Sequence, residues 1–125
     1  MKALSIRPQW AHAILHLGKD IENRSWSTTY RGPLLIHAGQ TMTRADYADF
    51  VNILEGKRIV PPDRSEIRCG GIVGIVDLYG ITEKRGSPWF TGKVGWRLRN
   101  PKPLPFKPWK GQLGLFEVPG INVRN

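Results

Sequence analysis

The sequence predicts an α+β fold in which five or six short strands form a small, partly closed mixed β-barrel with two main helices. Fourteen glycines and ten prolines divide the 125 residues into many short elements joined by turns. Only two segments carry apolar residues at helical spacing, and both fall in the first half. Closing so small a sheet would also remove its unpaired edges. Residues 1–125 are expected to form one domain.

The first half of the chain is predicted to alternate strands and helices. Residues 2–7 form a short strand, after which Pro8 suits the first position of a helix because its missing N–H has no helical partner there. Gly18 is a plausible stop for this helix. Residues 20–26 are predicted to be extended, and residues 34–38 form the next strand.

A second helix is predicted between Thr43 and Gly56. Thr43 can cap its first turn, and Asp46 three residues later supports that turn. The helix then presents an apolar stripe made of Tyr47, Phe50, Val51 and Leu54. Residues 57–69 are polar, contain two consecutive prolines and are expected to form a loop.

Strands dominate the prediction for the second half. Residues 71–79 are almost continuously apolar, as in a central strand buried on both faces. A loop over residues 80–92 precedes a strand over residues 94–99, in which apolar and polar positions alternate. Four prolines between residues 100 and 110 predict an extended connector, and residues 113–118 form the last strand.

The charge indicates a polyanionic partner. The formal net charge is +9, with nineteen Lys and Arg against ten Asp and Glu, and eleven of the cations are Arg, which suits phosphate and base stacking. The single cysteine, Cys69, excludes an internal disulfide framework, and a cytoplasmic location is the simplest expectation. No apolar run is long enough to span a bilayer, so no membrane partner is expected.

The most informative segment is Gly18-Lys19-Asp20-Ile21-Glu22-Asn23-Arg24-Ser25-Trp26. In an extended chain, alternate residues share one face, so the four side chains at positions 20, 22, 24 and 26 would lie side by side, next to Lys19 at the preceding turn. An aromatic ring beside cations suits a nucleobase and its phosphate. The alternative is a surface ladder of paired charges with Trp26 covering the core.

The histidines and Asp77 allow several interpretations. His12 and His16 lie four residues apart but have no third ligand in the sequence, so neither a metal site nor a cofactor is predicted. His37 ends an apolar strand, either as a core residue bonded to the backbone or as a group that faces a cleft. Asp77 interrupts an apolar run and is expected to have a cationic or N–H partner.

Other motifs narrow the choice of function. No Ser, His and carboxylate set and no phosphate-binding glycine loop occurs in the sequence. Trp10 and Trp96 fall on the apolar faces of their elements and are expected to pack. The remaining tryptophans lie in or beside predicted loops, where exposed aromatic residues favour binding, and these are Trp26, Trp89 and Trp109.

Motifs spread over nearly the whole chain match a known pattern. They begin with Lys2-Ala3-Leu4-Ser5-Ile6-Arg7 and the segment Gly18–Trp26. They continue through Tyr30-Arg31-Gly32-Pro33-Leu34-Leu35-Ile36-His37-Ala38, Gly71-Ile72-Val73-Gly74 and Gly111-Gln112-Leu113-Gly114-Leu115-Phe116-Glu117-Val118. On these residues the chain resembles an ASCH domain, a module grouped with the PUA-like barrels. The resemblance implies a PUA-like barrel of five to six strands and a cleft beside the first helix that binds RNA or another nucleic acid.

The resemblance also implies which residues form the cleft. Lys19, Glu22 and Arg24 match the cleft-lining motif, and Trp26, His37, Arg7 and Gln9 are further candidates for ligand contact. Some relatives are amidohydrolases of acylated cytidine, and others are described as ribonucleases. In the amidohydrolase branch the motif is G-x-K-T-x-T-x-R, and Glu22 stands where that branch has its catalytic second Thr. The family's usual Arg-Gln-Pro-Trp is Arg-Pro-Gln-Trp here, which rotates the Gln by about 100° around a helix axis.

Three functions follow as hypotheses. The leading one is a module that binds RNA, DNA or a nucleoside, which Arg24→Ala should weaken and Lys57→Ala, on a loop expected to be distant, should not. The second is a small hydrolase of a modified nucleoside or RNA in which Lys19 and Glu22 are catalytic. The third is a protein adaptor that uses the proline-rich residues 101–108 and Trp109.

Overall fold

Six strands form one mixed sheet in the computed structural model, which describes residues 1–121. The strand order is β2-β5-β4-β3-β1-β6, and β1 and β3 are parallel while the other neighbours are antiparallel. The strands are β1 (Lys2–Ile6), β2 (Ile21–Arg24), β3 (Gly32–Ala38), β4 (Gly71–Thr82), β5 (Val94–Pro108) and β6 (Leu115–Glu117). The helices are α1 (Pro8–His16), α2 (Arg44–Gly56) and a 3-10 turn, η1 (Arg64–Glu66).

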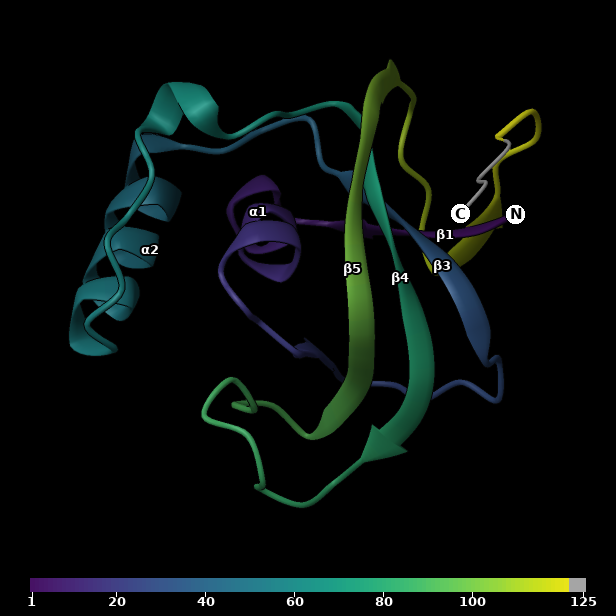
Figure 1. The fold of residues 1–125 in the computed structure, drawn as a ribbon, viewed down its shortest axis with the longest axis horizontal. Helices are drawn as coiled ribbons and strands as arrows, with labels where there is room; N and C mark the ends of the chain where they lie inside the picture. Colours follow the sequence, from purple (N-terminus) through teal and green to yellow (C-terminus); the bar gives the residue numbers. More distant parts are fainter. Residues whose placement is uncertain (122–125) are drawn as a thin grey trace.

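The sheet is curled, and α1 lies between it and α2 (Figure 1). Helix α1 contacts β3, β4 and β5 on one side and α2 on the other. This is the predicted α+β class, with β4 in the interior of the sheet between β5 and β3 as expected. The strand β2, which carries the candidate site, forms the sheet edge beside β5.

Local sequence signals explain where both helices begin. Pro8 is the first residue of α1, where it loses no helical hydrogen bond. Helix α2 starts with a complete capping box, in which the Thr43 hydroxyl accepts from the Asp46 N–H and the Asp46 carboxylate accepts from the Thr43 N–H, each at 3.0 Å. The first turn of each helix is therefore fixed by the residues predicted to fix it.

The core divides into packed clusters on the two sides of the sheet and between the helices. Trp96, fully buried, packs with the apolar faces of α1, β1 and β3. Phe50 and Leu54 of α2 pack with Trp89 and Phe90 from the loop before β5. A third cluster covers the other side of β1 and β3 and includes Phe116. The loop over residues 83–93 is thus anchored in the core, although it has no regular structure.

The predicted connector over residues 100–110 is wrong, because β5 continues through the prolines to Pro108. Strand β2 pairs only with residues 94–97 of β5, so the following residues pair with β4 on one side alone. Proline, which cannot donate an N–H, is tolerated on such an unpaired flank. The residues 101–108 that the adaptor hypothesis uses therefore belong to a strand of the sheet.

Several other bounds differ from the predictions. Strand β4 extends to Thr82, β6 is limited to Leu115–Glu117, and η1 interrupts the loop predicted over residues 57–69. Register shifts in the β4–β5 pairing bend the long strands, which a strict alternation pattern does not reveal.

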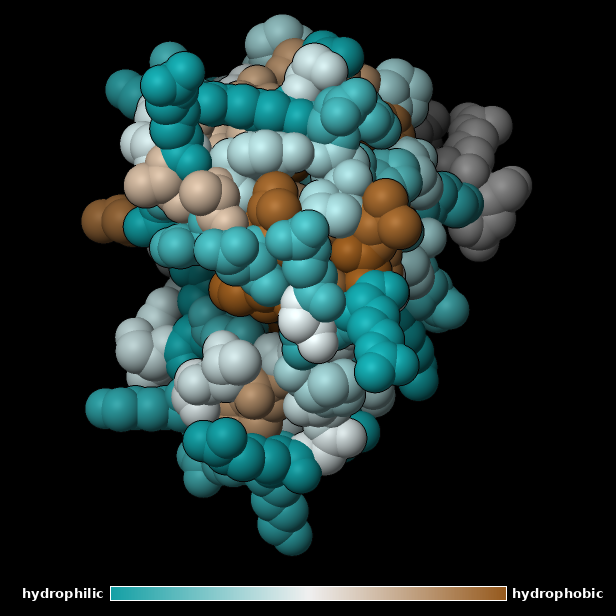
Figure 2. Space-filling model, turned by 90° about the vertical axis from the view of Figure 1, so that its left-hand side faces the viewer, coloured by the Kyte–Doolittle hydropathy of each residue, from teal (hydrophilic) through white to brown (hydrophobic). Residues whose placement is uncertain are grey.

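The surface is predominantly polar on the side that carries α2, with small hydrophobic patches between polar side chains (Figure 2). This agrees with the formal net charge of +9. Among residues 1–121, no helix has the length and apolar character needed to cross a membrane.

Candidate functional site

A cavity of about 420 Å³ opens between the end of β1, the start of α1, strand β2, the C-terminal turns of α2 and the loop before β5. Its lining contains four cationic residues and one carboxylate, so it is electropositive. The residues around it are Ser5, Ile6, Arg7, Trp10, Lys19, Glu22, Asn23, Arg24, Ile53, Lys57, Pro88, Trp89 and Thr91.

A turn after α1 directs Lys19 into this cavity. Gly18 has a φ of +77°, a left-handed conformation that an L residue adopts only with strain. The Lys19 N–H then donates to the Ala13 carbonyl at 3.2 Å, which closes the end of the helix. The predicted glycine stop therefore also determines where the lysine lies.

Lys19, Glu22 and Arg24 form one charged cluster, as predicted from their spacing. Lys19 Nζ lies 3.5 Å from Glu22 Oε1, and Arg24 Nε lies 3.1 Å from Glu22 Oε2. Lys19 Nζ also donates to the Ile21 carbonyl. Lys19 is 5% exposed and Glu22 is 8% exposed, so both charges are largely removed from water. Burial lowers the pKa of the Lys19 ammonium below its usual value, and the Glu22 carboxylate partly offsets this shift.

Arg24 is held by the backbone of β1 and by Glu22. Its Nη2 donates to the Ser5 carbonyl at 2.7 Å. Its Nε is in ion-pair contact with Glu22, but the N–H does not point along a hydrogen bond, and this buried atom has no acceptor among the described residues. Arg24 is therefore fixed by the backbone of β1 and by the Glu22 carboxylate, and its Nε is covered by the surrounding side chains.

Two indoles contribute to the walls of the cavity. Trp10 of α1 packs edge-on against Phe50, with ring centroids 5.1 Å apart, and Trp89 comes from the loop before β5. Lys57 Nζ lies 4.7 Å from the Trp89 ring centroid and donates to the Pro88 carbonyl at 2.9 Å. The cavity thus offers aromatic surface as well as positive charge.

Asn23 holds the loop that carries Trp89. Its Nδ2 donates to the Trp89 carbonyl at 3.0 Å, and its Oδ1 accepts from the backbone N–H groups of Thr91 and Gly92. Because Asn23 is on β2, this loop is tied directly to the strand that carries Glu22 and Arg24.

The predicted face of alternate residues ends at Arg24. Trp26 lies after the end of β2, where its half-exposed ring packs edge-on against Trp96 at 4.8 Å and does not line the cavity. Asp20 lies just before the strand and accepts a hydrogen bond from Ser87 Oγ at 2.6 Å, also outside the cavity lining. Of the four alternate residues, Glu22 and Arg24 therefore lie together at the cavity, whereas Asp20 and Trp26 lie outside it.

Arg7 and Gln9 differ in their surroundings. Arg7 lines the cavity, and its exposed guanidinium pairs with Asp46 at 3.6 Å. Gln9 is 3% exposed, does not belong to the cavity lining, and its Oε1 has no hydrogen-bond partner among the described residues. The Pro-Gln order of this sequence thus puts the Gln at a buried position.

His37 lies outside the cavity and matches the core alternative. It is 1% exposed, with Nδ1 2.9 Å from Ser5 Oγ and Nε2 2.6 Å from the Trp109 carbonyl. Asp77, expected to have a cationic or N–H partner, accepts from Asn100 Nδ2 at 2.8 Å.

The sequence predictions missed several lining residues, among them Lys57, Trp10 and Asn23. Lys57, assigned to a distant loop, lies at the cavity wall, so that assignment was wrong. Trp10 was expected only to pack, and Asn23 was not singled out. Lys57 is brought to the cavity by the packing of α2 on α1, and this long-range contact leaves no sign in the local sequence.

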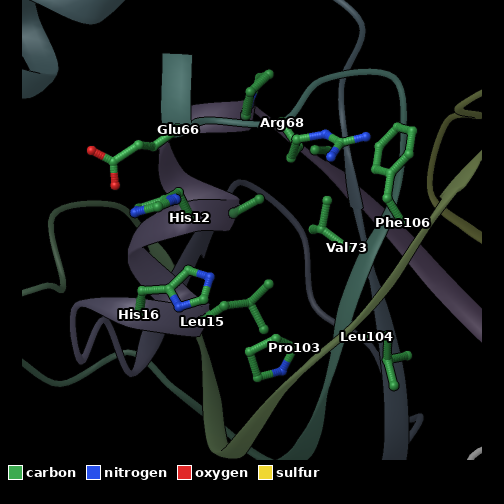
Figure 3. Close-up of a pocket in the computed structure, with 12 residues that line it drawn as sticks. His12, Leu15, His16, Glu66, Arg68, Val73, Pro103, Leu104 and Phe106 are labelled. Atoms are coloured by element: carbon green, nitrogen blue, oxygen red, sulfur yellow. The ribbon is translucent and has the colours of Figure 1, made fainter. Parts of the chain in front are cut away.

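A second, smaller hollow of about 190 Å³ lies on the other side of α1 (Figure 3). The His12 and His16 ring centroids are 4.7 Å apart, and Glu66 lies near His12. Arg68 points toward Phe106, with its guanidinium carbon 4.1 Å from the ring centroid. Over residues 1–121, no group of three or more His, Cys, Asp or Glu side chains is placed to hold a metal ion.

Comparison with known proteins gave one family. The sequence model of the ASCH domain matches residues 4–124, which is nearly the whole chain. A search of curated proteins found no match.

Proposed function

The chain belongs to the ASCH domain family, which is linked in general to RNA binding, and on this premise we propose that it binds RNA by taking one nucleoside into the Lys19–Glu22–Arg24 cavity. The observation that carries this proposal is the combination of a largely buried charged cluster with two indole-bearing walls. A flat ring can stack on an indole, while ionised donors and acceptors bind its polar edge.

The individual roles follow from the contacts. Arg24 lines the cavity, and a guanidinium group can donate to a carbonyl or ring nitrogen of the base. Glu22 forms ion pairs with both neighbouring cations, and its carboxylate can also accept from an exocyclic amino group. Lys57 and Arg7, at the wall of the cavity, are suited to the phosphate.

The test is binding of mononucleosides and of a short single-stranded RNA, measured by calorimetry and by NMR shifts. Arg24→Ala should weaken binding of both about tenfold, because a charge-assisted hydrogen bond is lost. Arg31→Ala is the matched control, since Arg31 is exposed and donates to the carbonyls of Thr28 and Tyr30 in its own loop. Equal losses in the two variants would indicate diffuse charge attraction and contradict the proposal.

The lowered pKa of Lys19 supports hydrolysis as a second candidate function. A neutral Lys19 amine could take a proton from water as the water oxygen bonds to an acyl carbon, and return it to the nitrogen that leaves. Glu22 replaces the catalytic Thr of the amidohydrolase branch, so water rather than a side-chain oxygen would be the nucleophile.

This candidate predicts that an acylated cytidine is cleaved and that Lys19→Ala abolishes cleavage while ligand binding survives. Lys110→Ala removes the same charge from an exposed position and serves as the control. Absence of product from acylated nucleosides and from single-stranded RNA would leave binding as the function.

A further inference from the structure

Two arginines outside the cavity are held by an aromatic ring instead of a carboxylate. The guanidinium carbons of Arg97 and Arg99 lie 5.4 and 4.6 Å from the ring centroid of Tyr79. Arg97 and Arg99 are exposed residues of β5, and Tyr79 is a 39% exposed residue of β4. A guanidinium stacked on a ring keeps its N–H donors free for another group.

The carboxylates nearby are already engaged. Asp77 lies opposite Arg99 in the β4–β5 pairing, but it accepts from Asn100 Nδ2. Asp20 accepts from Ser87 Oγ. Within residues 1–121, neither Arg97 nor Arg99 forms an ion pair within 4.0 Å. The guanidinium groups of the pair are therefore not held by a carboxylate in this part of the chain.

Two small hollows share lining residues with each other, and one of them shares a residue with the cavity. A hollow of about 200 Å³ is lined by both Lys19 and Arg99, and Lys19 also lines the cavity itself. Asp20 lines this hollow and a further one of about 230 Å³, which reaches Tyr79 and Arg97. Just before β2, Lys19 is thus shared by the cavity and one hollow, and Asp20 is shared by the two hollows that the stacked arginines line.

We propose that Arg97 and Arg99, held on the Tyr79 ring, bind the sugar–phosphate backbone of a single-stranded nucleic acid whose nucleoside occupies the cavity. The ligand is then an oligonucleotide and not a free nucleoside. This inference rests on the proposed function, and it adds a second binding surface on the outer side of the sheet. Asp20 lies along the same path and disfavours a phosphate at that one point.

The experiment compares a labelled single-stranded RNA octamer with a mononucleoside, in the intact protein and in Arg97→Gln/Arg99→Gln. The double variant should lose about tenfold or more in octamer affinity, while mononucleoside affinity stays unchanged. The slope of log K against log salt should become less steep by about 1.4, because each phosphate contact to a single strand contributes about 0.7.

Two further variants separate a specific site from general charge loss. Lys2→Gln/Arg31→Gln removes the same charge at positions that lie outside these hollows and should leave the octamer slope unchanged. Tyr79→Phe should bind the octamer normally, whereas Tyr79→Ala should weaken it, because the ring and not the hydroxyl orients the arginines.

The outcomes distinguish this inference from the proposed function. If the Arg97/Arg99 variant behaves like its charge-matched control, or loses mononucleoside affinity equally, the backbone surface is refuted. If the Arg97/Arg99 variant loses as much affinity for a polyglutamate peptide as for the octamer, the backbone surface is also refuted. If Arg24→Ala changes nothing while the Arg97/Arg99 variant still weakens octamer binding, the cavity proposal fails by itself.

Discussion

Glu22 stabilises the site because it is shared between two cations. Lys19 and Arg24 contact different oxygens of the same carboxylate, and Lys19 and Glu22 are almost excluded from water. Burial of a single ion is strongly unfavourable, and only the mutual contacts make this arrangement tolerable. Glu22 should therefore stabilise the folded protein, in addition to its proposed contact with a base.

Glu22→Gln should lower the free energy of unfolding by about 3 kcal/mol, because two neighbouring cations would lose their shared counter-charge. The pKa of Lys19 should fall further, since the Glu22 carboxylate raises it in the native protein. Chemical denaturation measures the loss. Glu55→Gln, at an exposed position of α2, is the control and should change stability little. Equal stability of the two variants would contradict this account of the cluster.

The predictions at this scale succeeded where neighbours in sequence are neighbours in space. Residues 19, 22 and 24 lie on one turn and one short strand, so their spacing was enough to bring them together. Lys57 and Trp89 reach the same cavity from α2 and from a loop. Their positions depend on tertiary packing, which spacing alone does not encode.

At the scale of elements, α2 depends on the two reciprocal bonds of its cap. The Thr43 backbone N–H and hydroxyl, both bonded to Asp46, lower the pKa of the Asp46 carboxyl below its usual value. A lowered folded pKa means that the contribution of the carboxylate is complete above the unfolded pKa near 3.8 and is lost as the pH falls through the lower folded value.

Thr43→Ala should therefore destabilise the protein by about 1 kcal/mol at neutral pH, as observed for lost helix caps in general. Its stability should also decline less than that of the native protein as the medium is acidified below pH 4, because the Asp46 pKa returns toward normal. Thermal unfolding across this pH range tests both effects. If Thr43→Ala loses as much stability on acidification as the native protein, the cap is not the source of the acid sensitivity.

Helix α1 carries a coupled pair of histidines on the face opposite the cavity. Burial is the main cause that lowers the pKa of His12 below 6.5, the positive charge of His16 lowers it further, and Glu66 partly opposes the shift. His16→Ala should raise the His12 pKa, and Glu66→Gln should lower it. Imidazole proton shifts followed by NMR report both changes. Movement in the same direction in the two variants would contradict the assigned causes.

At the scale of the molecule, the positive charge should determine how tightly a nucleic acid binds. The cavity should determine which nucleoside is selected. The chain carries nineteen cationic side chains against ten anionic ones. Octamer affinity should fall steeply between about 50 and 200 mM salt, through reduced counterion release. Binding of an uncharged nucleoside should change little over the same range. Anisotropy and calorimetry measure the two slopes, and a salt-insensitive octamer would refute a backbone contribution.

The overall architecture was predictable because each segment is locally consistent with it. Proline at the start of α1, a capping box at α2 and an apolar run in β4 all agree with the observed elements. The extent of β5 was not predictable in this way, since proline normally argues against a strand. Only the sheet order reveals that this part of β5 needs a partner on one side alone.

The prolines of β5 have a protective consequence for the protein. An open strand flank with unpaired amides can template the addition of strands from other copies, which leads to aggregation. Beyond its contact with β2, the flank of β5 is interrupted by Pro101, Pro103, Pro105 and Pro108, none of which can donate the required N–H. The same prolines that make this strand hard to predict from the sequence should therefore disfavour edge-to-edge association between copies of the protein.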